Sequence, residues 1–146
     1  MPWTPRTTVA AVIEHYGRFL FVLEKTADGL VINQPAGHLE SGETLHQAVC
    51  REVLEETAYP FQPAGLVGIY RLPLAGDLTY LRYCFFGDIE PQQERPLDQD
   101  ILGTLWLNPD EVQQGRYRHR SPLVWQCLRD YLKGRRYPLE LLNEVD

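Results

Sequence analysis

A single mixed α/β domain is the fold class that this sequence predicts. Its 146 residues have the length of one ordinary domain. Short apolar runs rich in β-branched residues predict strands, and a long segment free of glycine and proline predicts a helix among them. No internal repeat, low-complexity tract or linker divides the chain. Residues 1–146 are therefore expected to fold as one domain.

The first third of the chain predicts three short strands. Thr7–Ile13 and Arg18–Leu23 are apolar runs on either side of the turn-forming segment His15–Gly17, a pattern typical of a hairpin. Leu30–Ile32 is a third short run, and it precedes the polar segment Asn33–Gly37, which predicts a turn.

The segment from Leu45 to Thr57 predicts the longest helix, because it contains neither glycine nor proline. Thr44 and Gln47 have the spacing of a capping box, in which each side chain bonds the backbone of the other residue. Pro60 follows the helix closely, and proline does not continue an α-helix. A helix with a capped start and a defined end is expected.

Two longer strands come next, Gly65–Leu74 and Leu78–Ile89, joined by a turn at Gly76-Asp77. A polar loop that contains proline then runs from Glu90 to Asp100. A short strand over Gly103–Leu107 follows this loop.

The last part of the chain predicts two helices. A small one starts at Asn108-Pro109-Asp110, where asparagine and proline suit the first positions of a helix. A longer one starts near Ser121-Pro122 and ends around Gly134. The tail RRYPLELLNEVD remains without a predicted element.

Composition and charge exclude several classes of function. The net charge of −6 argues against a nucleic-acid polymer as partner, because phosphate backbones select basic surfaces. No apolar run is long enough to span a membrane, and Met1–Thr8 lacks the apolar region of a signal peptide. Cys50, Cys84 and Cys127 form no CxxC pair and no zinc-spaced cluster. They are expected to be reduced thiols in a cytoplasmic protein.

The long helix carries an unusual arrangement of charges. At about 100° per residue, one sector of the helix gathers the apolar side chains of Leu45, Ala48, Val49 and Val53. Glu52 and Glu56 fall in the same sector, and Glu55 lies on its flank. Carboxylates in an apolar face are costly unless they are paired, and a single Arg51 does not neutralise three of them. A divalent cation with oxygen ligands, Mg²⁺ or Mn²⁺, removes this cost; a solvated charged face is the alternative.

The segment GHLESGETLHQAVCREVLEETAY, from Gly37 to Tyr59, resembles the signature of the Nudix hydrolase family. That signature has a glycine, five residues, a glutamate, seven residues, Arg-Glu, an aliphatic residue, any residue, and Glu-Glu. The positions that match it are Gly37, Glu43, Arg51, Glu52, Val53, Glu55 and Glu56. Ala58 stands where the family pattern has a glycine, which predicts a different helix exit or a modest strain.

The resemblance implies the Nudix fold, a mixed β-sheet sandwiched between helices (α/β/α), and metal-dependent hydrolysis of phosphoanhydride bonds. It implies Mg²⁺ as the cofactor, with Mn²⁺ as a possible substitute. Glu52 and Glu56 would be the principal metal ligands. A backbone carbonyl around Ala36–Gly37 would complete the metal site.

Further roles follow from the same resemblance. Glu43 would pair with Arg51 and orient the cluster; a plain structural ion pair is compatible with that role. Glu55 would be either a further metal ligand or the base that accepts a proton from the attacking water. In other members of the family the base lies on a distant loop, where the candidates in this chain are Glu94, Asp98 and Asp100.

Several side chains that are not at the fixed positions of the signature are candidates for substrate binding. Asp98 and Asp100 lie just before a predicted strand, where Nudix enzymes often place acids that recognise a base or bind metal. His38 follows Gly37 and is a candidate for a phosphate contact. An exposed acid and a loop histidine without a role are the respective alternatives.

Arginine and aromatic residues give weaker signals. Arg82 is the most plausible phosphate ligand among the three candidate arginines, the others being Arg6 and Arg71. For any one of them, a surface ion pair is the better expectation. Tyr83 and Trp106 could stack on a heterocycle, but aromatic residues in strands more often belong to the core.

Three flanking segments narrow the resemblance to one group of bacterial phosphatases in the family: NQPAGHLE at 33–40, RSPLV at 120–124 and RYPLE at 136–140. This implies hydrolysis of nucleoside triphosphates, nucleoside diphosphates and hydroxymethylpyrimidine pyrophosphate, with release of orthophosphate. The partner is then a small phosphorylated substrate, without a nucleic acid or membrane, and the chain acts as a monomer or homodimer.

Two other readings remain open. One is a dinucleotide or sugar-nucleotide pyrophosphatase, which differs only in its products. The other is a noncatalytic ligand-sensing module, although such modules usually lack one or more of the signature glutamates that this chain retains. An RNA-cap-type hydrolase is disfavoured by the acidic charge and by the lack of a basic extension.

Overall fold

The structure is a computed structural model that describes residues 2–145, so Met1 and Asp146 lie outside the described residues. Its strands are β1 (Arg6–Val12), β2 (Glu14–His15), β3 (Arg18–Thr26), β4 (Gly29–Asn33), β5 (Ala36–His38), β6 (Phe61–Pro73), β7 (Thr79–Ile89) and β8 (Ile101–Leu107). Its helices are α1 (Leu45–Thr57), α2 (Pro109–Gln113), α3 (Leu123–Leu132) and the 3₁₀ helix η1 (Leu139–Leu141).

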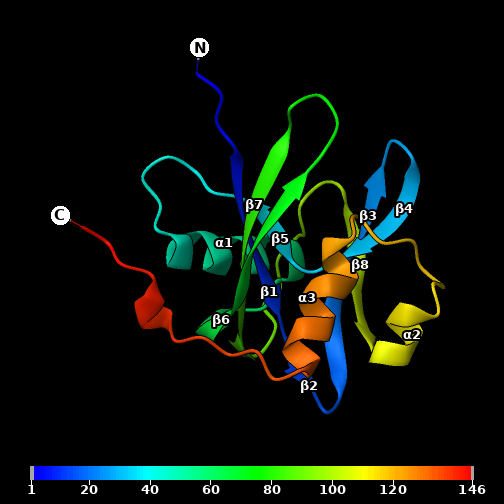
Figure 1. Ribbon diagram of the computed structural model, residues 1–146. Coiled ribbons are helices and arrows are strands. Elements are labelled where there is room, and N and C mark those ends of the chain that lie inside the picture. The colour runs from blue at the N-terminus through cyan, green and yellow to red at the C-terminus, as the bar shows by residue number, and fades with distance from the viewer. Residues whose placement is uncertain (1, 146) are drawn as a thin grey trace.

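Two four-stranded sheets form the scaffold (Figure 1). The first has the order β5-β1-β7-β6; β1 and β7 are parallel, and the other neighbours are antiparallel. In the second, β3 is antiparallel to β2, β4 and β8. The expected mixed α/β architecture is confirmed, with its strands divided between two sheets.

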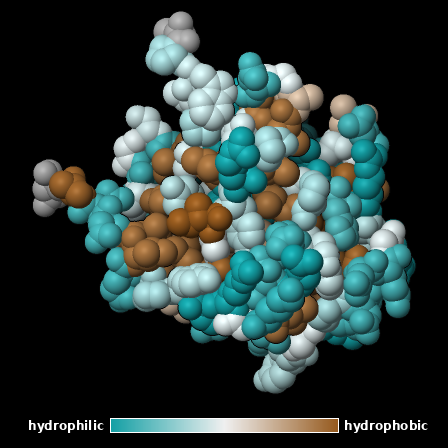
Figure 2. Space-filling view, viewed as in Figure 1, coloured by the Kyte–Doolittle hydropathy of each residue, from teal (hydrophilic) through white to brown (hydrophobic). Residues whose placement is uncertain are grey.

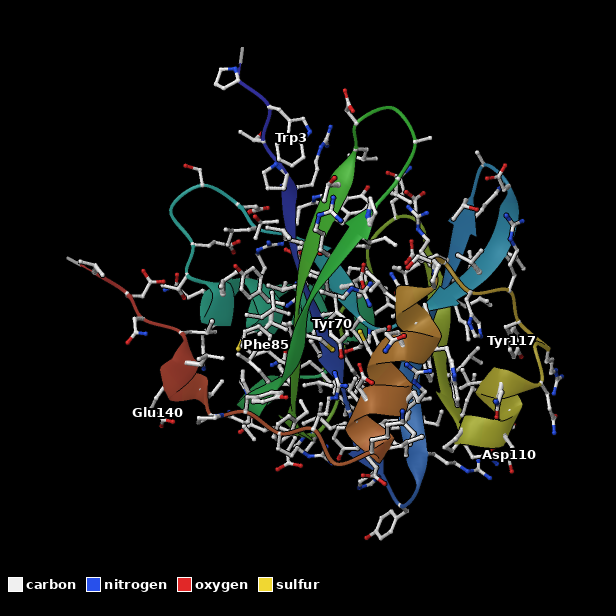
Figure 3. The ribbon with its side chains drawn as sticks, in the orientation of Figure 1. Trp3, Tyr70, Phe85, Asp110, Tyr117 and Glu140 are labelled. Carbon is white, nitrogen blue, oxygen red and sulfur yellow. The ribbon has the colours of Figure 1, made fainter. Side chains whose placement is uncertain are left out.

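Helices cover both faces of the first sheet. Along β1, Val9 packs in the core cluster shared with α1, and Ala10 packs in the cluster shared with α3, because side chains of a strand alternate between faces. Figure 3 labels one residue from each side, Phe85 and Tyr70. Phe85 belongs to the α1 cluster, whereas the hydroxyl of Tyr70 donates to Asp130 of α3 at 2.8 Å. The α/β/α layering is therefore confirmed.

Helix α1 begins and ends as local chemistry dictates. The Thr44 hydroxyl accepts from the Gln47 N–H, and the Gln47 side chain accepts from the Thr44 N–H, each at 3.0 Å. Ala58 ends the helix in the left-handed conformation, with φ 63°, and its N–H donates to the Leu54 carbonyl. The usual helix exit is thus kept without glycine, at a strain of roughly 1–2 kcal/mol.

The hairpin predicted between the first two apolar runs is wrong. Tyr16 and Gly17 do form a tight turn, with φ values of 51° and 77°, but this turn joins β3 to the two-residue strand β2. Strand β1 pairs instead with β5 and β7 in the other sheet. The chain crosses between the sheets at Ile13, because a local pattern specifies a turn but not the partner of the preceding strand.

Several boundaries also differ from the prediction. The segment predicted as a turn at Asn33–Gly37 contributes to β4 and β5, and β5 pairs with β1. Strand β6 begins at Phe61 rather than Gly65, and β8 begins at Ile101 rather than Gly103. Ends of strands are decided by their pairing partners, which the sequence does not display.

The tail packs back onto the scaffold. Leu66 and Tyr137 exchange two backbone hydrogen bonds of 2.8 Å, which place the segment before η1 alongside β6. Figure 2 shows hydrophobic side chains gathered on the side of the molecule that bears the C-terminal tail. Ile69 and Leu141, which are both exposed, line a common surface pocket with Tyr137. No helix among residues 2–145 is long and apolar enough to cross a membrane.

Candidate active site

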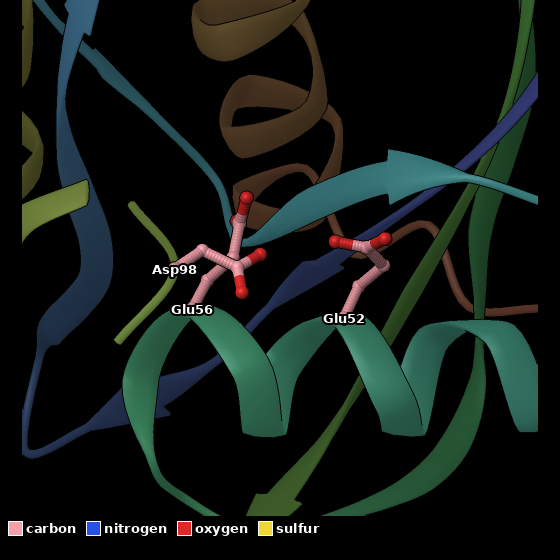
Figure 4. Close-up of side chains that lie close together, drawn as sticks. All are labelled: Glu52, Glu56 and Asp98. Atoms are coloured by element: carbon pink, nitrogen blue, oxygen red, sulfur yellow. The ribbon is translucent and has the colours of Figure 1, made fainter. Parts of the chain in front are cut away.

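Three carboxylates meet beside α1. Glu52 and Glu56 lie one turn apart on the buried face of the helix, and each is 8% exposed. Asp98 approaches them from the loop between β7 and β8, so that one carboxylate oxygen from each residue lies within 4.8 Å of the other two (Figure 4). The predicted placement of two acids in the apolar face is confirmed. The solvated-face alternative does not apply to Glu52 and Glu56.

Backbone hydrogen bonds hold the Asp98 loop against the end of α1. The Asp98 N–H donates to the Glu55 carbonyl at 3.0 Å, and the Gln93 N–H donates to the Ala58 carbonyl at 2.8 Å. The loop therefore follows the helix end closely enough to bring Asp98 to the glutamates. The sequence predicts Asp98 to be a loop acid that binds metal or substrate. These backbone contacts place it beside Glu52 and Glu56.

Two other acids of this region lie away from the three carboxylates. Asp100 accepts the Lys25 N–H at 3.0 Å through its backbone carbonyl, and its side chain is exposed. Glu94 is exposed as well. Neither residue contributes to the group of Glu52, Glu56 and Asp98. Neither lines the pocket into which Glu52 and Glu56 open.

Gly37 allows the Glu52 carboxylate to pass the edge strand β5. A Cβ atom at position 37 would overlap the carboxylate carbon and both oxygens of Glu52. Glycine is therefore needed here for close approach, and not for a left-handed backbone. The neighbouring Ala36 donates its N–H to Glu56 Oε1 at 3.0 Å. Strand β5 thus contacts both buried glutamates.

Arg51 connects the signature residues. Its Nε donates to Glu43 Oε2 at 2.5 Å, and its Nη2 donates to Glu43 Oε1 at 3.0 Å, which forms a two-pronged pair. Its Nη1 donates to Glu52 at 2.7 Å and to Glu55 at 3.2 Å. Its Nη2 also donates to the His38 carbonyl at 3.0 Å. Arg51 therefore fixes α1 against both β5 and the preceding loop.

Burial dominates the electrostatics of the two glutamates. Desolvation raises the pKa of Glu56 to about 9, and the charge of Glu52 adds to the rise. Desolvation also raises the pKa of Glu52 to about 7, against the lowering effect of Arg51. In contrast, hydrogen bonding to Arg51 lowers the pKa of Glu43. The two inner acids hold protons more strongly than the outer one because water is excluded from them.

This donor set fits a divalent cation. Glu56 is buried, and no lysine, arginine or histidine of residues 2–145 lies within ion-pair distance of it. The nearby groups that bear a lone pair are carboxylate oxygens, the ligands that Mg²⁺ and similar hard cations prefer. A cation at this point would replace the protons that burial otherwise retains.

The glutamates open into a pocket of about 490 Å³. Its acidic side contains Glu52 and Glu56 together with Glu24 and Glu40. Elsewhere its wall is formed by apolar side chains, namely Leu72, Leu74, Tyr80 and Leu123, and by polar groups from β1, β4, β7 and the start of α3. The pocket thus combines an acidic end with a surface suited to an organic group.

The structure separates the remaining candidates. His38 and Arg82 line the pocket, whereas Arg6 and Arg71 are exposed side chains outside its lining. The surface ion pair expected for Arg82 is wrong: the residue is 5% exposed and has no carboxylate within 4.0 Å among residues 2–145. Burial and the charge of Arg6 lower the pKa of His38.

The two aromatic candidates belong to the core. Tyr83 and Trp106 both pack against the α1-side cluster, and Trp106 meets the ring of Tyr59 edge-on, with centroids 6.2 Å apart. The aromatic residue at the pocket is instead Tyr80, one strand period from Arg82. Sequence reasoning missed Tyr80. The signal was its spacing of two residues from Arg82, because residues two apart in a strand project from the same face.

Sequence reasoning also missed the buried amides beside the pocket. Asn33 and Gln34 are 7% and 1% exposed, and both accept hydrogen bonds from Arg82. The sequence predicts a polar turn for the segment that contains them. Their partner is a residue about fifty positions away in the sequence, so no local pattern reveals the contact.

Comparisons with known proteins agree with this geometry. The family profile of the NUDIX domain matches residues 3–126. The phosphatase NudJ of Escherichia coli strain K12 is 40% identical over 97% of this chain and 93% of its own length. A Nudix hydrolase structure from Nitrosomonas europaea is 45% identical, with a TM-score of 0.93 over 97% of this chain and 98% of that one. The MutT Nudix hydrolase of Burkholderia pseudomallei shares the fold, with a TM-score of 0.75 at 19% identity over 88% of this chain and 98% of that one.

The family signature contains the two helix glutamates of the site, and the comparisons identify the same family. The signature falls inside the matched range 3–126, and two of its glutamates, Glu52 and Glu56, lie at the acidic end of the pocket. The relation to a bacterial phosphatase, expected from the flanking segments, is confirmed. The chain therefore belongs to the Nudix family, and it is a NudJ-like Nudix hydrolase.

Proposed function

We propose that this enzyme is a Mg²⁺-dependent phosphohydrolase that cleaves a phosphoanhydride bond in a small phosphorylated substrate and releases orthophosphate. The observation that carries the proposal is the group of Glu52, Glu56 and Asp98, of which Glu52 and Glu56 line the pocket. Glu52 and Glu56 are buried, and neither Glu56 nor Asp98 has a cationic partner among residues 2–145. Burying them is unfavourable unless a cation binds there.

The proposed metal ligands are Glu52, Glu56 and Asp98, with backbone oxygen near Gly37 and Glu55 as further candidates. A divalent cation held by these residues would offset negative charge on phosphate oxygens and would make a water molecule more acidic. Mg²⁺ is favoured because all the donors are hard oxygens, and Mn²⁺ is the expected substitute. A solution measurement of metal preference tests this choice.

The residues around the ligands have supporting roles in this proposal. Glu43 and Arg51 are positioning residues, because Arg51 bridges Glu43, Glu52 and Glu55. Glu55 is proposed as the base that accepts the proton of the attacking water. Its side chain is 32% exposed and is restrained by Arg51 at 3.2 Å, so it is accessible but oriented.

The substrate is proposed to lie along the pocket away from the acids. His38 and Arg82 line this part and are proposed to contact the substrate, whereas Asp100 is exposed and does not line the pocket. The name phosphatase for NudJ supports orthophosphate as a product. Nucleoside triphosphates, nucleoside diphosphates and hydroxymethylpyrimidine pyrophosphate are the substrates proposed from the sequence resemblance.

The proposal treats the whole chain as one catalytic domain. The tail beyond the matched range supports this, because residues near Tyr137 pair with β6 in the central scaffold. The three cysteines are free thiols, which supports a reducing compartment such as the cytoplasm. A monomer and a homodimer both remain compatible with this proposal.

The test is a product analysis with separate quantification of orthophosphate and pyrophosphate. Purified protein is incubated with Mg²⁺ and with nucleoside triphosphates, diphosphates, dinucleotides, sugar nucleotides and hydroxymethylpyrimidine pyrophosphate; EDTA is the control. EDTA-sensitive release of orthophosphate from mononucleotides or the pyrimidine compound supports the proposal. Pyrophosphate release, or cleavage of dinucleotides or sugar nucleotides alone, replaces it with the alternative Nudix activity. Ligand binding without turnover replaces it with the sensing function.

A further inference from the structure

Gln34 is a buried amide whose two ends bond different parts of the fold. It lies in the connection between β4 and β5 and is 1% exposed. Its Oε1 accepts a hydrogen bond from Nη1 of Arg82, on β7, at 3.0 Å. Its Nε2 donates to the carbonyl of Val124, on α3, at 2.8 Å. One side chain therefore connects the arginine of the pocket to the helix that covers this face of the sheet.

The two partners of Gln34 determine the orientation of its amide. A guanidinium can only donate hydrogen bonds, and a carbonyl can only accept them. The reversed amide would direct its NH₂ group at the Arg82 cation and its oxygen at the Val124 carbonyl, so both hydrogen bonds would be lost. Because the amide is buried, water does not replace these partners. Gln34 is thus held in a single orientation.

Arg82 in turn depends on hydrogen bonds for its orientation. Besides the bond to Gln34, its Nη1 donates to Cys127 Sγ at 3.8 Å, and its Nη2 donates to Asn33 Oδ1 at 3.2 Å. No carboxylate among residues 2–145 lies within 4.0 Å of the guanidinium. Its Nε is buried without a hydrogen-bond partner. The acceptors at the two Nη atoms therefore fix the plane of the guanidinium.

Gln34 differs from Asn33 in its relation to the pocket. Arg82 and Asn33 both line the pocket, so either can contact a ligand directly. Gln34 lies behind Arg82 and does not line the pocket. An effect of Gln34 on a bound ligand must therefore be transmitted by another residue, and Arg82 is the pocket residue that its side chain bonds.

We propose that Gln34 is a positioning residue, whose amide holds the guanidinium of Arg82 in the orientation that meets the substrate and ties that orientation to α3. The inference rests on the proposed function, in which Arg82 contacts the substrate. Leu123, at the start of α3, lines the same pocket, so the amide also fixes the guanidinium relative to this part of the wall. Loss of the amide weakens substrate binding and leaves the carboxylates of α1 unchanged.

Steady-state hydrolysis of ATP with Mg²⁺ tests the proposal. Gln34→Leu is expected to raise KM by about fivefold or more, because a hydrogen bond to a charged group is lost. Its kcat is expected to stay within about twofold of wild type, as for an interaction made equally in the ground state and the transition state. An unchanged KM in folded Gln34→Leu overturns the positioning role.

Gln126→Leu is the matched control. Gln126 is also a partly buried glutamine that bonds across the α3 face, since its Nε2 donates to Asp130 at 3.1 Å, but it neither bonds Arg82 nor lines the pocket. We expect this variant to lose stability while its KM stays at the wild-type value. A rise in KM equal to that of Gln34→Leu would mean that loosening α3 is sufficient, and would contradict a specific role of Gln34.

A double variant tests whether Gln34 acts through Arg82. Arg82→Met is expected to raise KM, and Gln34→Leu in the Arg82→Met background is expected to raise it no further, because the group that Gln34 orients is absent. Gln34→Glu is a second single variant, which keeps the shape of the side chain. It lacks the donor for Val124 and neutralises Arg82, so its KM should also rise. This variant decides the question if Gln34→Leu does not fold. Additive effects in the double variant, or a wild-type KM in Gln34→Glu, contradict the proposal.

Nitrogen-15 NMR of the arginine side chains tests the orientation of Arg82 without enzymatic activity. A guanidinium with acceptors at both Nη atoms rotates slowly, so wild-type Arg82 should give separate Nη signals, assigned by their absence in Arg82→Met. We expect the Nη1 signal to shift and broaden in Gln34→Leu and to stay unchanged in Gln126→Leu. Unchanged Arg82 signals in Gln34→Leu overturn the positioning role, whatever the enzyme hydrolyses. If the wild type does not hydrolyse nucleotides, the proposed function fails, and these NMR signals alone decide whether Gln34 positions Arg82.

Discussion

The carboxylate of Glu52 occupies the space that a side chain at Gly37 would require. We expect Gly37→Ala to displace this carboxylate, to destabilise the fold by about 1–3 kcal/mol through overpacking, and to weaken metal binding. Thermal unfolding and Mn²⁺ titration measure the two effects. Gly103→Ala is the control, because a Cβ there meets nothing within 4 Å. Wild-type Mn²⁺ affinity in Gly37→Ala would show that the position of Glu52 is not critical for the metal.

Glu56→Gln should lower kcat by at least about 100-fold and leave the fold intact. Loss of a group that only supports a metal ligand already costs about 10–100-fold, and Glu56 is proposed to be a ligand itself. In the absence of metal its pKa is raised to about 9, so the protein already holds it in the protonated, neutral form near pH 7. A neutral amide is therefore well tolerated in EDTA. Steady-state kinetics and melting curves test both parts, and near-normal turnover would contradict the metal assignment.

The stabilisation that metal provides should increase with pH. Folded-state pKa values of about 7 for Glu52 and about 9 for Glu56 exceed their ordinary value near 4.5, so the folded protein binds more protons than the unfolded chain. Stability in EDTA must then fall as pH rises from about 5 to 9. Mg²⁺ replaces these protons and flattens the dependence. Melting temperatures with Mg²⁺ and with EDTA across this range provide the measurement; parallel curves contradict the prediction.

Arg51 and Glu43 should be energetically coupled. The two-pronged contact between them, at 2.5 and 3.0 Å, is the geometry that a guanidinium and a carboxylate favour. In a double-mutant cycle of Arg51→Met and Glu43→Gln, unfolding by urea should give a coupling energy of about 1 kcal/mol or more. Arg51→Lys should not restore wild-type kcat, because lysine cannot bridge Glu43, Glu52 and Glu55 at once. Additive single-variant effects would mean that the contact does not position the cluster.

Loss of the Glu55 carboxylate should mainly lower kcat, whereas loss of the Asp98 carboxylate should weaken metal binding. We expect Glu55→Gln to lower kcat by roughly 10²–10⁴-fold with little change in Mn²⁺ affinity, as for loss of a general base. Asp98→Asn should weaken Mn²⁺ binding, because its carboxylate lies with those of Glu52 and Glu56. Comparing Mn²⁺ titration with kcat in the two variants assigns the roles. The reverse pattern would make Asp98 the base and Glu55 the ligand.

The sequence by itself determined the parts of this protein that depend on local chemistry. Helix α1 occupies the predicted range, since the Thr44–Gln47 capping box and the absence of glycine and proline act within a few residues. The period of the helix likewise places Glu52 and Glu56 on its apolar face, and this placement depends on no tertiary contact. The signature that contains them is equally local, and it sufficed to indicate the family.

Only the tertiary structure decided the relations between segments that are distant in sequence. It placed β1 beside β7 instead of in the predicted hairpin, and it brought Asp98 to the glutamates through backbone bonds between its loop and α1. It also buried Arg82 against Asn33 and Gln34. Such contacts depend on how strands pair and how loops close across the whole domain. Local periodicity and turn chemistry carry no information about them, because the partner of each group lies dozens of residues away.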